Sequence, residues 1–206
     1  MQFTNLQERA QPVPRALSSL IGSIGSLLGA EWFANAERAQ LKRYRAHHGG
    51  PGEMVALRLL VFAGSPIEAI PPEELGNWIW LVHFMALLSG PNRDPHSTSI
   101  EARPGRVLHQ AGYNEFRLCR LLEARGERFQ TLLERALRRI ARLGEPLNWS
   151  KLAPLILADD TEGGPEHARI EIARDFAAAA ARSDFRNSSI APDNAQESLP
   201  GYDTHD

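Results

Sequence analysis

The feature that most constrains the fold is the spacing of the apolar residues, which follows the period of about 3.6 residues of an α-helix in nearly every segment. The spacing is clearest between residues 127 and 143. One face of the helix predicted there collects the apolar side chains Phe129, Leu132, Leu133, Ala136, Leu137, Ile140 and Leu143. No convincing run of alternating β-branched residues, which would predict strands, occurs in the sequence. The pattern therefore predicts an all-α protein.

Proline and glycine residues divide this helical pattern into separate segments. We expect helices over residues 16–30, 34–50, 53–64, 73–90, 106–110, 114–125, 127–143, 149–160 and 165–185. Residues 90–105 contain three prolines and two glycines and are predicted to form a linker loop. The resulting prediction is two small helical bundles joined by a loop, over residues 1–89 and 106–186, followed by a polar, disordered tail at 187–206.

The composition is that of an ordinary soluble globular protein, with 43% hydrophobic and 23% charged residues. No apolar run reaches the roughly 18 residues that cross a membrane. Residues 16–30 are apolar but broken by serines and glycines, which favours an N-terminal helix over a secretory signal. The single cysteine, Cys119, excludes an internal disulfide and is expected to be a small buried side chain. We therefore expect a cytoplasmic protein.

The charged residues are unevenly distributed along the chain, whose net charge is −2. Residues 103–142 contain 10 arginines and 4 glutamates, so this stretch alone carries a net charge of +6. The residues before it sum to −1 and those after it sum to −7. The near-neutral total thus conceals a basic middle segment and an acidic C-terminal segment.

Most of these arginines are predicted to point away from the core. Five lie on an arc roughly opposite the apolar face of the helix at 127–143, namely Arg128, Arg135, Arg138, Arg139 and Arg142. In the preceding helix, Arg117 and Arg120 lie one turn apart on the side away from the leucines. Neighbouring like charges on a helix repel, and guanidinium groups bind phosphate oxygens without reading base sequence. The pattern favours a nucleic-acid backbone as partner, with a simply solvated helix face as the alternative.

The sequence contains none of the motifs that commonly carry catalysis. There is no glycine-rich phosphate loop ending in Lys-Ser or Lys-Thr, and no serine has the spacing of a nucleophile elbow. The seven histidines are scattered, and His83 is expected to be a hydrogen-bonded core residue. The acidic residues Asp159, Asp160 and Glu162 are typical of a solvated loop. We therefore expect no enzymatic activity, no metal and no cofactor.

Two blocks of the chain are similar to a known family. The first is ERAQLKR at 37–43, and the second runs from Gly105 to Trp149, with a Gly-Arg-x-Leu opening, an Asn-Glu-x-Arg helix start, a leucine pair and a closing Asn-Trp. Ala-Arg-Asp-Phe at 173–176 extends the similarity. In this order the blocks resemble CasB, the small subunit of the type I-E CRISPR Cascade surveillance complex. Glu134 departs from the pattern by replacing one member of a basic pair.

The resemblance implies an all-helical, non-catalytic subunit of an RNA-guided antiviral complex, present as two copies stacked head to tail. Its implied partners are the other Cascade protein subunits, the CRISPR guide RNA and the target DNA, whose displaced strand it steadies in a basic groove. Residues of this chain that match basic positions of the family are Lys42, Arg43, Arg106, Arg117 and Arg135. The arginine pattern described above adds Arg120, Arg138, Arg139 and Arg142 to the predicted nucleic-acid-binding set.

Two other functions remain open from the sequence. A helical DNA-binding regulator would place an arginine-bearing helix in the major groove, and residues 121–129 could form the turn of a helix-turn-helix motif. Its arginines are, however, spread over three turns instead of being concentrated at the start of the helix. A protein–protein scaffold, in which the arginines meet an acidic partner, is the second alternative.

Overall fold

The computed structural model describes residues 13–45, 50–65, 67–157 and 164–190. Within these ranges there are nine α-helices, one short 3-10 helix and no strand. The helices are α1 (Val13–Gly29), α2 (Asn35–Lys42), α3 (Pro51–Phe62), η1 (Ile67–Ala69), α4 (Pro72–Leu88), α5 (Pro104–Gln110), α6 (Glu115–Glu123), α7 (Gly126–Leu143), α8 (Trp149–Leu157) and α9 (Gly164–Ile190). The predicted all-α class is confirmed.

Several helices begin or end at other residues than the sequence predicted. α2 ends at Lys42, well before the glycine pair that was expected to stop it. α5 begins at Pro104, because a proline is favoured in the first turn, where its missing N–H leaves no hydrogen bond unmade. α9 continues to Ile190 and so contains the first residues of the predicted tail. The rest of that tail, residues 191–206, lies outside the described residues.

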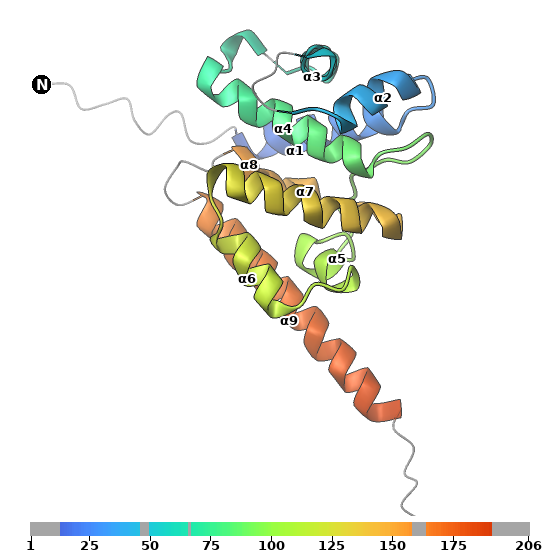
Figure 1. Ribbon diagram of the computed structural model, residues 1–206, viewed down its shortest axis with the longest axis vertical. Helices are drawn as coiled ribbons and strands as arrows, with labels where there is room; N and C mark the ends of the chain where they lie inside the picture. The colour runs from blue at the N-terminus through green and yellow to red at the C-terminus, as the bar shows by residue number, and fades with distance from the viewer. Residues whose placement is uncertain (1–12, 46–49, 66, 158–163, 191–206) are drawn as a thin grey trace, which may run out of the picture.

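The central element of the fold is α4, which packs against α1, α2 and α3 on one side and against α7 and α8 on the other (Figure 1). Residues 81–89 are all buried, as expected for a helix that is apolar on every face. Glu73 and Glu74 lie in its first turn, where negative charge complements the positive end of the helix dipole. The buried central helix predicted from this segment is confirmed.

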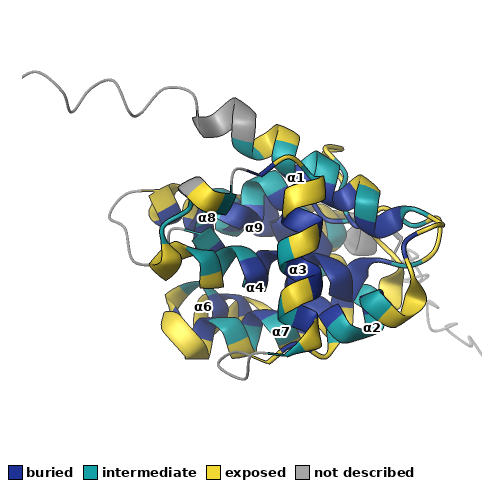
Figure 2. Ribbon diagram, turned by 90° about the horizontal axis from the view of Figure 1, so that it is seen from above, coloured by how far each residue is buried: buried dark blue, intermediate teal, exposed yellow. Residues whose placement is uncertain are grey.

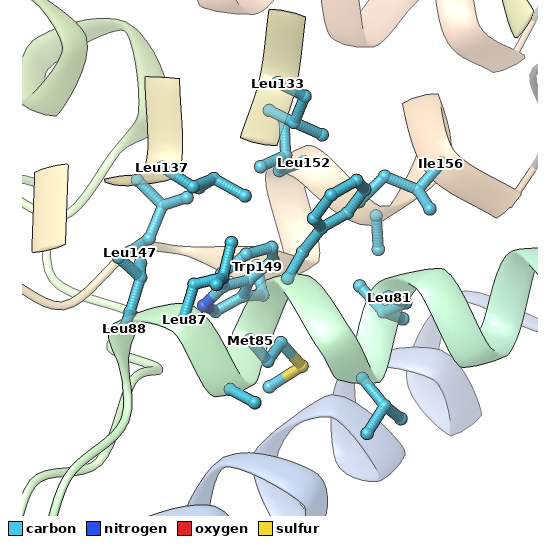
Figure 3. Packing of buried hydrophobic residues seen from close by; sticks show 14 of the residues in the cluster. Leu81, Met85, Leu87, Leu88, Leu133, Leu137, Leu147, Trp149, Leu152 and Ile156 are labelled. Carbon is cyan, nitrogen blue, oxygen red and sulfur yellow. The ribbon is translucent and has the colours of Figure 1, made fainter. Parts of the chain in front are cut away.

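The core is continuous between the two halves of the chain. Trp149 of α8 is fully buried, with Leu81 and Met85 of α4 and Leu137 of α7 around it (Figure 3). The buried side chains of both halves belong to one cluster. The predicted arrangement of two bundles is therefore not confirmed, since the core shows no division at the expected boundary.

The segment predicted to be a linker is packed against the body of the protein. The Trp149 indole nitrogen donates to the Pro95 carbonyl oxygen at 2.9 Å. The backbone of Leu147 donates to Pro95 at 3.0 Å and accepts from Ser97 at 3.3 Å. These bonds attach the segment between α4 and α5 to the start of α8, so it is packed against the protein and does not run free between the two halves.

The N-terminal part of α9 packs along α5 and α8, and its C-terminal part extends beyond the rest of the protein (Figure 1). The contact with α5 is close because Gly105 has no side chain. A Cβ atom at this position would lie 2.2 Å from the carbonyl oxygen of Ile172 in α9. The absence of a side chain at Gly105 therefore lets α5 pack closely against α9. The end of α5 in turn contacts the site described below. None of the helices described here is long and apolar enough to cross a membrane.

Candidate nucleic-acid interface

One face of α7 is buried, as its period predicts. Phe129, Leu133, Leu137 and Ile140 are almost completely excluded from solvent. Leu143 was predicted to join this face but is exposed, because the helix ends there and Gly144 turns the chain with a φ of 79°. The opposite face of α7 carries the arginines, so the orientation of the helix about its axis agrees with the sequence prediction.

An open groove of about 300 Å³ lies between α6 and α7, and we call it the α6–α7 groove. Its lining consists of Tyr113, Arg117, Arg120, Leu121, Leu132, Arg135 and Arg139. Four of the predicted nucleic-acid-binding arginines are thus brought together, two from each helix. The groove has cationic walls and an apolar floor.

The position of α6 follows from its first residue and its buried leucines. Asn114 precedes the helix with an extended backbone, and its side-chain oxygen accepts a hydrogen bond from the Arg117 amide at 3.0 Å. Leu118 and Leu121 are buried against the body. Because Arg117 and Arg120 lie at other angles around the helix, they line the groove or point to solvent.

Arg139 is fixed in place by the end of α5. Its Nε donates a hydrogen bond to the carbonyl oxygen of Ala111, the residue that caps α5. Its guanidinium lies against Gly112, where a Cβ atom would be only 2.8 Å from Nη2 and where the backbone φ is 72°. Glycine is favoured at such a positive φ, and here it also leaves room for the guanidinium. Arg139 is therefore held in position at the groove wall.

Tyr113 forms the end of the groove nearest α5. Burial raises the pKa of the Tyr113 hydroxyl, whereas the positive charges of Arg117, Arg139 and Arg135 lower it. The net effect is a raised pKa, in which burial outweighs the positive charges of the three arginines near the hydroxyl. An anion near this hydroxyl would be stabilised by the same charges.

The arginines of the basic segment fall into two classes by their partners. Of the 10 arginines between residues 103 and 142, four form ion pairs, namely Arg103 with Asp175, Arg106 with Glu101, Arg125 with Glu166 and Arg138 with Glu134. In the described part of the chain, the other six have no carboxylate partner; four of these line the α6–α7 groove, namely Arg117, Arg120, Arg135 and Arg139, and two do not, namely Arg128 and Arg142. Among the described residues, no carboxylate therefore pairs with the four arginines of the α6–α7 groove.

The arginines of α7 do not form a single line. Arg138 turns away from the groove, and its Nη2 lies 2.7 Å from a carboxylate oxygen of Glu134, which is also 3.5 Å from Arg45. Arg142 is exposed near the end of α7 but does not line the groove. The sequence correctly predicted that the arginines of α7 face outward, but it did not predict which of them line the groove.

The other predicted site residues have structural contacts of their own. The Lys42 ammonium donates to the Ser89 carbonyl oxygen at 2.8 Å, and burial, assisted by Arg93 and Arg38, lowers the pKa of this lysine. Arg43 is exposed, and its Nε donates to the Ala39 carbonyl oxygen of its own helix at 3.1 Å. Neither residue lines the groove.

Arg106 is half-buried, with 15% of its side chain exposed, and it forms an ion pair of 2.7 Å with Glu101. A guanidinium that is already paired and largely covered presents little surface to a ligand. Of the nine residues predicted for nucleic-acid binding, the α6–α7 groove therefore brings together Arg117, Arg120, Arg135 and Arg139, and it does not include the other five.

An exposed aromatic residue beside the groove was not identified from the sequence. Phe116 on α6 is 68% exposed, and the guanidinium carbon of Arg120 lies 5.8 Å from its ring centroid. The sequence did contain a signal for this exposed ring, because Phe116 lies one turn before Arg120 and outside the pattern of buried leucines. Cys119, on the same helix, was predicted to be buried and is exposed, because it lies on this outer face.

A second surface feature lies on the N-terminal half. A shallow apolar pocket of about 100 Å³ is lined by Trp32, Phe33, Glu37, Val55, Arg58, Leu59 and Phe62, and we call it the α3 surface. Trp32 and Phe62 are 68% and 73% exposed, and exposed residues run along α3 (Figure 2). Arg58 and Glu37 form an ion pair of 2.6 Å at its edge. Exposed apolar surfaces of this kind are typical of protein interfaces.

Comparison of the chain with models of known protein families, with curated proteins and with solved structures gave no match. The resemblance to CasB therefore stays a prediction made from the residues quoted above. Among the residues that the structure describes, no group of three or more His, Cys, Asp or Glu side chains is arranged to hold a metal ion. The α6–α7 groove is the candidate functional site.

Proposed function

We propose that this protein is a non-catalytic small subunit of a type I-E CRISPR RNA-guided surveillance complex. In this proposal the α6–α7 groove binds the sugar–phosphate backbone of target DNA, above all of the displaced strand, next to the hybrid with the guide RNA. The observation that carries it is that four arginines of one open groove have no carboxylate partner among the residues that the structure describes. Such charges attract phosphate and bind it bidentately.

A few phosphate contacts that do not read sequence suit the proposed role. Opening target DNA to pair with a guide RNA is close to balanced in free energy, so a few phosphate contacts that do not read sequence shift the equilibrium. Each phosphate neutralised on a single strand steepens the dependence of log K on log salt by about 0.7. A groove with four arginines is therefore a strongly salt-dependent support for a displaced strand.

The α3 surface supports the part of the proposal that concerns protein partners. Trp32 and Phe62 are large, exposed and apolar, and Phe62 belongs to α3, which lies apart from α6 (Figure 1). Aromatic side chains of this kind commonly anchor protein interfaces. In the proposed complex, this surface contacts another Cascade subunit or the second copy of this chain, and the whole assembly is cytoplasmic.

The direct test removes the three groove arginines whose guanidinium groups have no hydrogen bond among the described residues, and it keeps Arg139, which is bound to the end of α5. We expect the variant Arg117→Ala/Arg120→Ala/Arg135→Ala to weaken binding to a labelled oligothymidylate and to flatten its salt slope by about 2, because three phosphate contacts are lost. Fluorescence anisotropy across a salt series measures both. The matched control is Arg58→Ala/Arg138→Ala/Arg174→Ala, which removes three exposed arginines that are paired with glutamates elsewhere.

An equal loss of affinity in both variants would show that only total charge matters, which contradicts a groove-specific site. Binding of an acidic protein in place of nucleic acid would favour the scaffold, and a preference for one duplex sequence would favour the regulator. Purification of the tagged chain from its own cells, with its RNA and protein partners identified, separates these cases further. Short repeat-spacer RNAs with several protein subunits are the expected result.

A further inference from the structure

We propose that Phe116 is a base-stacking residue, through which the α6–α7 groove selects single-stranded nucleic acid over duplex. This inference rests on the proposed function, since it concerns the same groove, and it assigns strand selectivity to one named side chain. It is carried by the position of an exposed aromatic ring next to a set of arginines that have no carboxylate partner in the described structure.

The geometry connects the ring to the groove through Arg120. Phe116 and Arg120 are one helical turn apart on α6, and the Arg120 guanidinium lies over the Phe116 ring with its carbon 5.8 Å from the centroid. Arg120 also lines the groove. A strand whose phosphates lie on the groove arginines therefore passes within one side chain of the exposed ring.

The strength of stacking decides what happens to Arg120 when a strand binds. An exposed cation–π contact strengthens an interaction by roughly 2- to 5-fold, whereas stacking one base on an aromatic side chain contributes roughly 5- to 150-fold. A base therefore displaces the guanidinium from the ring. The released Arg120 then pairs with a phosphate of the same strand, so the two contacts support each other.

The lining of the groove fits the same ligand. Leu132 and the ring of Tyr113, both half-buried, offer apolar surface for sugars and base faces, between arginines that offer positive charge for phosphates. A single strand exposes both kinds of group. A duplex exposes its phosphates but keeps its bases stacked inside, where Phe116 cannot reach them. Electrostatic binding alone would not distinguish the two forms, and the aromatic ring does.

A protein interface is the other use of an exposed phenylalanine, and the surroundings of Phe116 argue against it. The exposed residues around it on α6 are mostly charged, with Glu115, Arg117, Arg120 and Glu123 beside the uncharged Cys119. Interfaces with proteins are depleted of charged residues at their centre. The α3 surface, where Trp32 and Phe62 line one apolar pocket, has the opposite character.

The experiment compares strand selectivity in variants that differ only in the ring. Anisotropy titrations of the full chain use labelled oligothymidylate and a labelled hairpin duplex at the same low salt concentration. Phe116→Leu keeps apolar bulk on the helix but removes the aromatic face, and Phe116→Trp restores an aromatic face. Phe62→Leu is the matched control, since it removes another exposed phenylalanine far from α6.

We expect Phe116→Leu to weaken binding of the single strand by roughly 5- to 150-fold, to leave duplex binding unchanged and to be rescued by Phe116→Trp. A single strand containing 5-iodouracil should also crosslink to the peptide that contains Phe116 on irradiation. Equal binding of single strand and duplex, with no effect of Phe116→Leu, would overturn this inference and leave the groove intact as a phosphate site. Failure of the unmodified chain to bind either ligand would overturn the proposed function itself. An effect of Phe116→Leu on protein partners alone would assign the ring to a protein interface.

Discussion

Two regions of the protein, the end of α1 and the α6–α7 groove, use their cationic side chains in opposite ways. In the N-terminal half, Arg38 is buried, and it donates to the Leu28 carbonyl oxygen at 3.0 Å and to the Ala30 carbonyl oxygen, at the end of α1. In the C-terminal half, Arg117 and Arg135 lie at an open groove and have no carboxylate or carbonyl partner among the described residues. The same residue type supports the fold at the end of α1 and is available to a ligand in the groove.

The difference between Arg38 and the groove arginines depends on whether the side chain reaches the end of a helix. The last turn of every α-helix leaves carbonyl oxygens without partners, and a nearby cation that reaches them becomes part of the fold. Arg38 does this for α1, and Lys42 does it for α4 through the Ser89 carbonyl oxygen. Arg117 and Arg135 lie on the sides of their helices, where the carbonyl oxygens are already used within the helix. Only arginines on the sides of helices therefore remain available to bind phosphate.

The largest expected effect that tests this contrast is on stability in the N-terminal half. Arg38→Ala should lower the free energy of unfolding by about 3 kcal/mol, because it removes charged hydrogen bonds and leaves buried carbonyl oxygens unsatisfied. Urea unfolding followed by circular dichroism measures the change. Arg135→Ala is the control, and it should change stability by less than about 0.5 kcal/mol. Similar losses in the two variants would abolish the distinction between structural and available arginines.

The next effect is a pH dependence that belongs to the N-terminal half. Burial lowers the pKa of His83, although its hydrogen bond to the Leu41 carbonyl oxygen raises it, and the charges of Glu134 and Arg138 act in opposite directions. The folded protein therefore keeps His83 neutral at a pH where the unfolded chain binds a proton. Stability is fully present above the ordinary pKa of 6.5 and falls as the pH drops below it.

Between pH 6.5 and 5 this loss is at most about 2 kcal/mol, since one proton changes the free energy of unfolding by about 1.4 kcal/mol per pH unit. Burial also lowers the pKa of His96, which contributes with the same sign. The difference between the unmodified chain and His83→Asn in urea unfolding at several pH values isolates the contribution of His83. An identical pH profile for the two proteins would contradict it.

The smallest expected effect concerns Arg139, the one groove arginine that belongs to both classes. It caps the end of α5 through the Ala111 carbonyl oxygen and also lines the groove. Arg139→Ala should therefore lower stability by about 1 kcal/mol and weaken oligothymidylate binding as well. Unfolding and anisotropy measurements on the same protein, next to Arg135→Ala, separate the two roles. Loss of binding without loss of stability would place Arg139 wholly with the ligand-binding residues.

The sequence predicts best the features that depend on neighbours in the chain. The buried face of α7 follows from period alone, because Phe129, Leu133, Leu137 and Ile140 recur every three or four residues. The start of α6 follows from Asn114, whose side chain bonds a backbone amide three residues away. The predicted ends of the helices were less accurate, since these ends depend on contacts between helices, such as that of Gly105 with α9.

The division of the arginines could not be predicted in this way. Arg125 pairs with Glu166, and Arg103 pairs with Asp175, so each partner lies in a helix distant along the chain. Composition counts these charges but does not say which ones meet. The same limit applies to Phe116, whose importance depends on the groove that α6 forms with α7. Local periodicity identifies the faces of helices, whereas the site depends on how those faces meet.

The continuous core has a consequence for how the groove is oriented in a larger assembly. The α3 surface and the α6–α7 groove lie on helices that pack, through α4, α7 and α8, into one cluster of buried side chains. The segment between α4 and α5, which might have served as a hinge, is tied to Leu147 and Trp149. A partner bound to α3 would consequently fix the orientation of the α6–α7 groove relative to that partner.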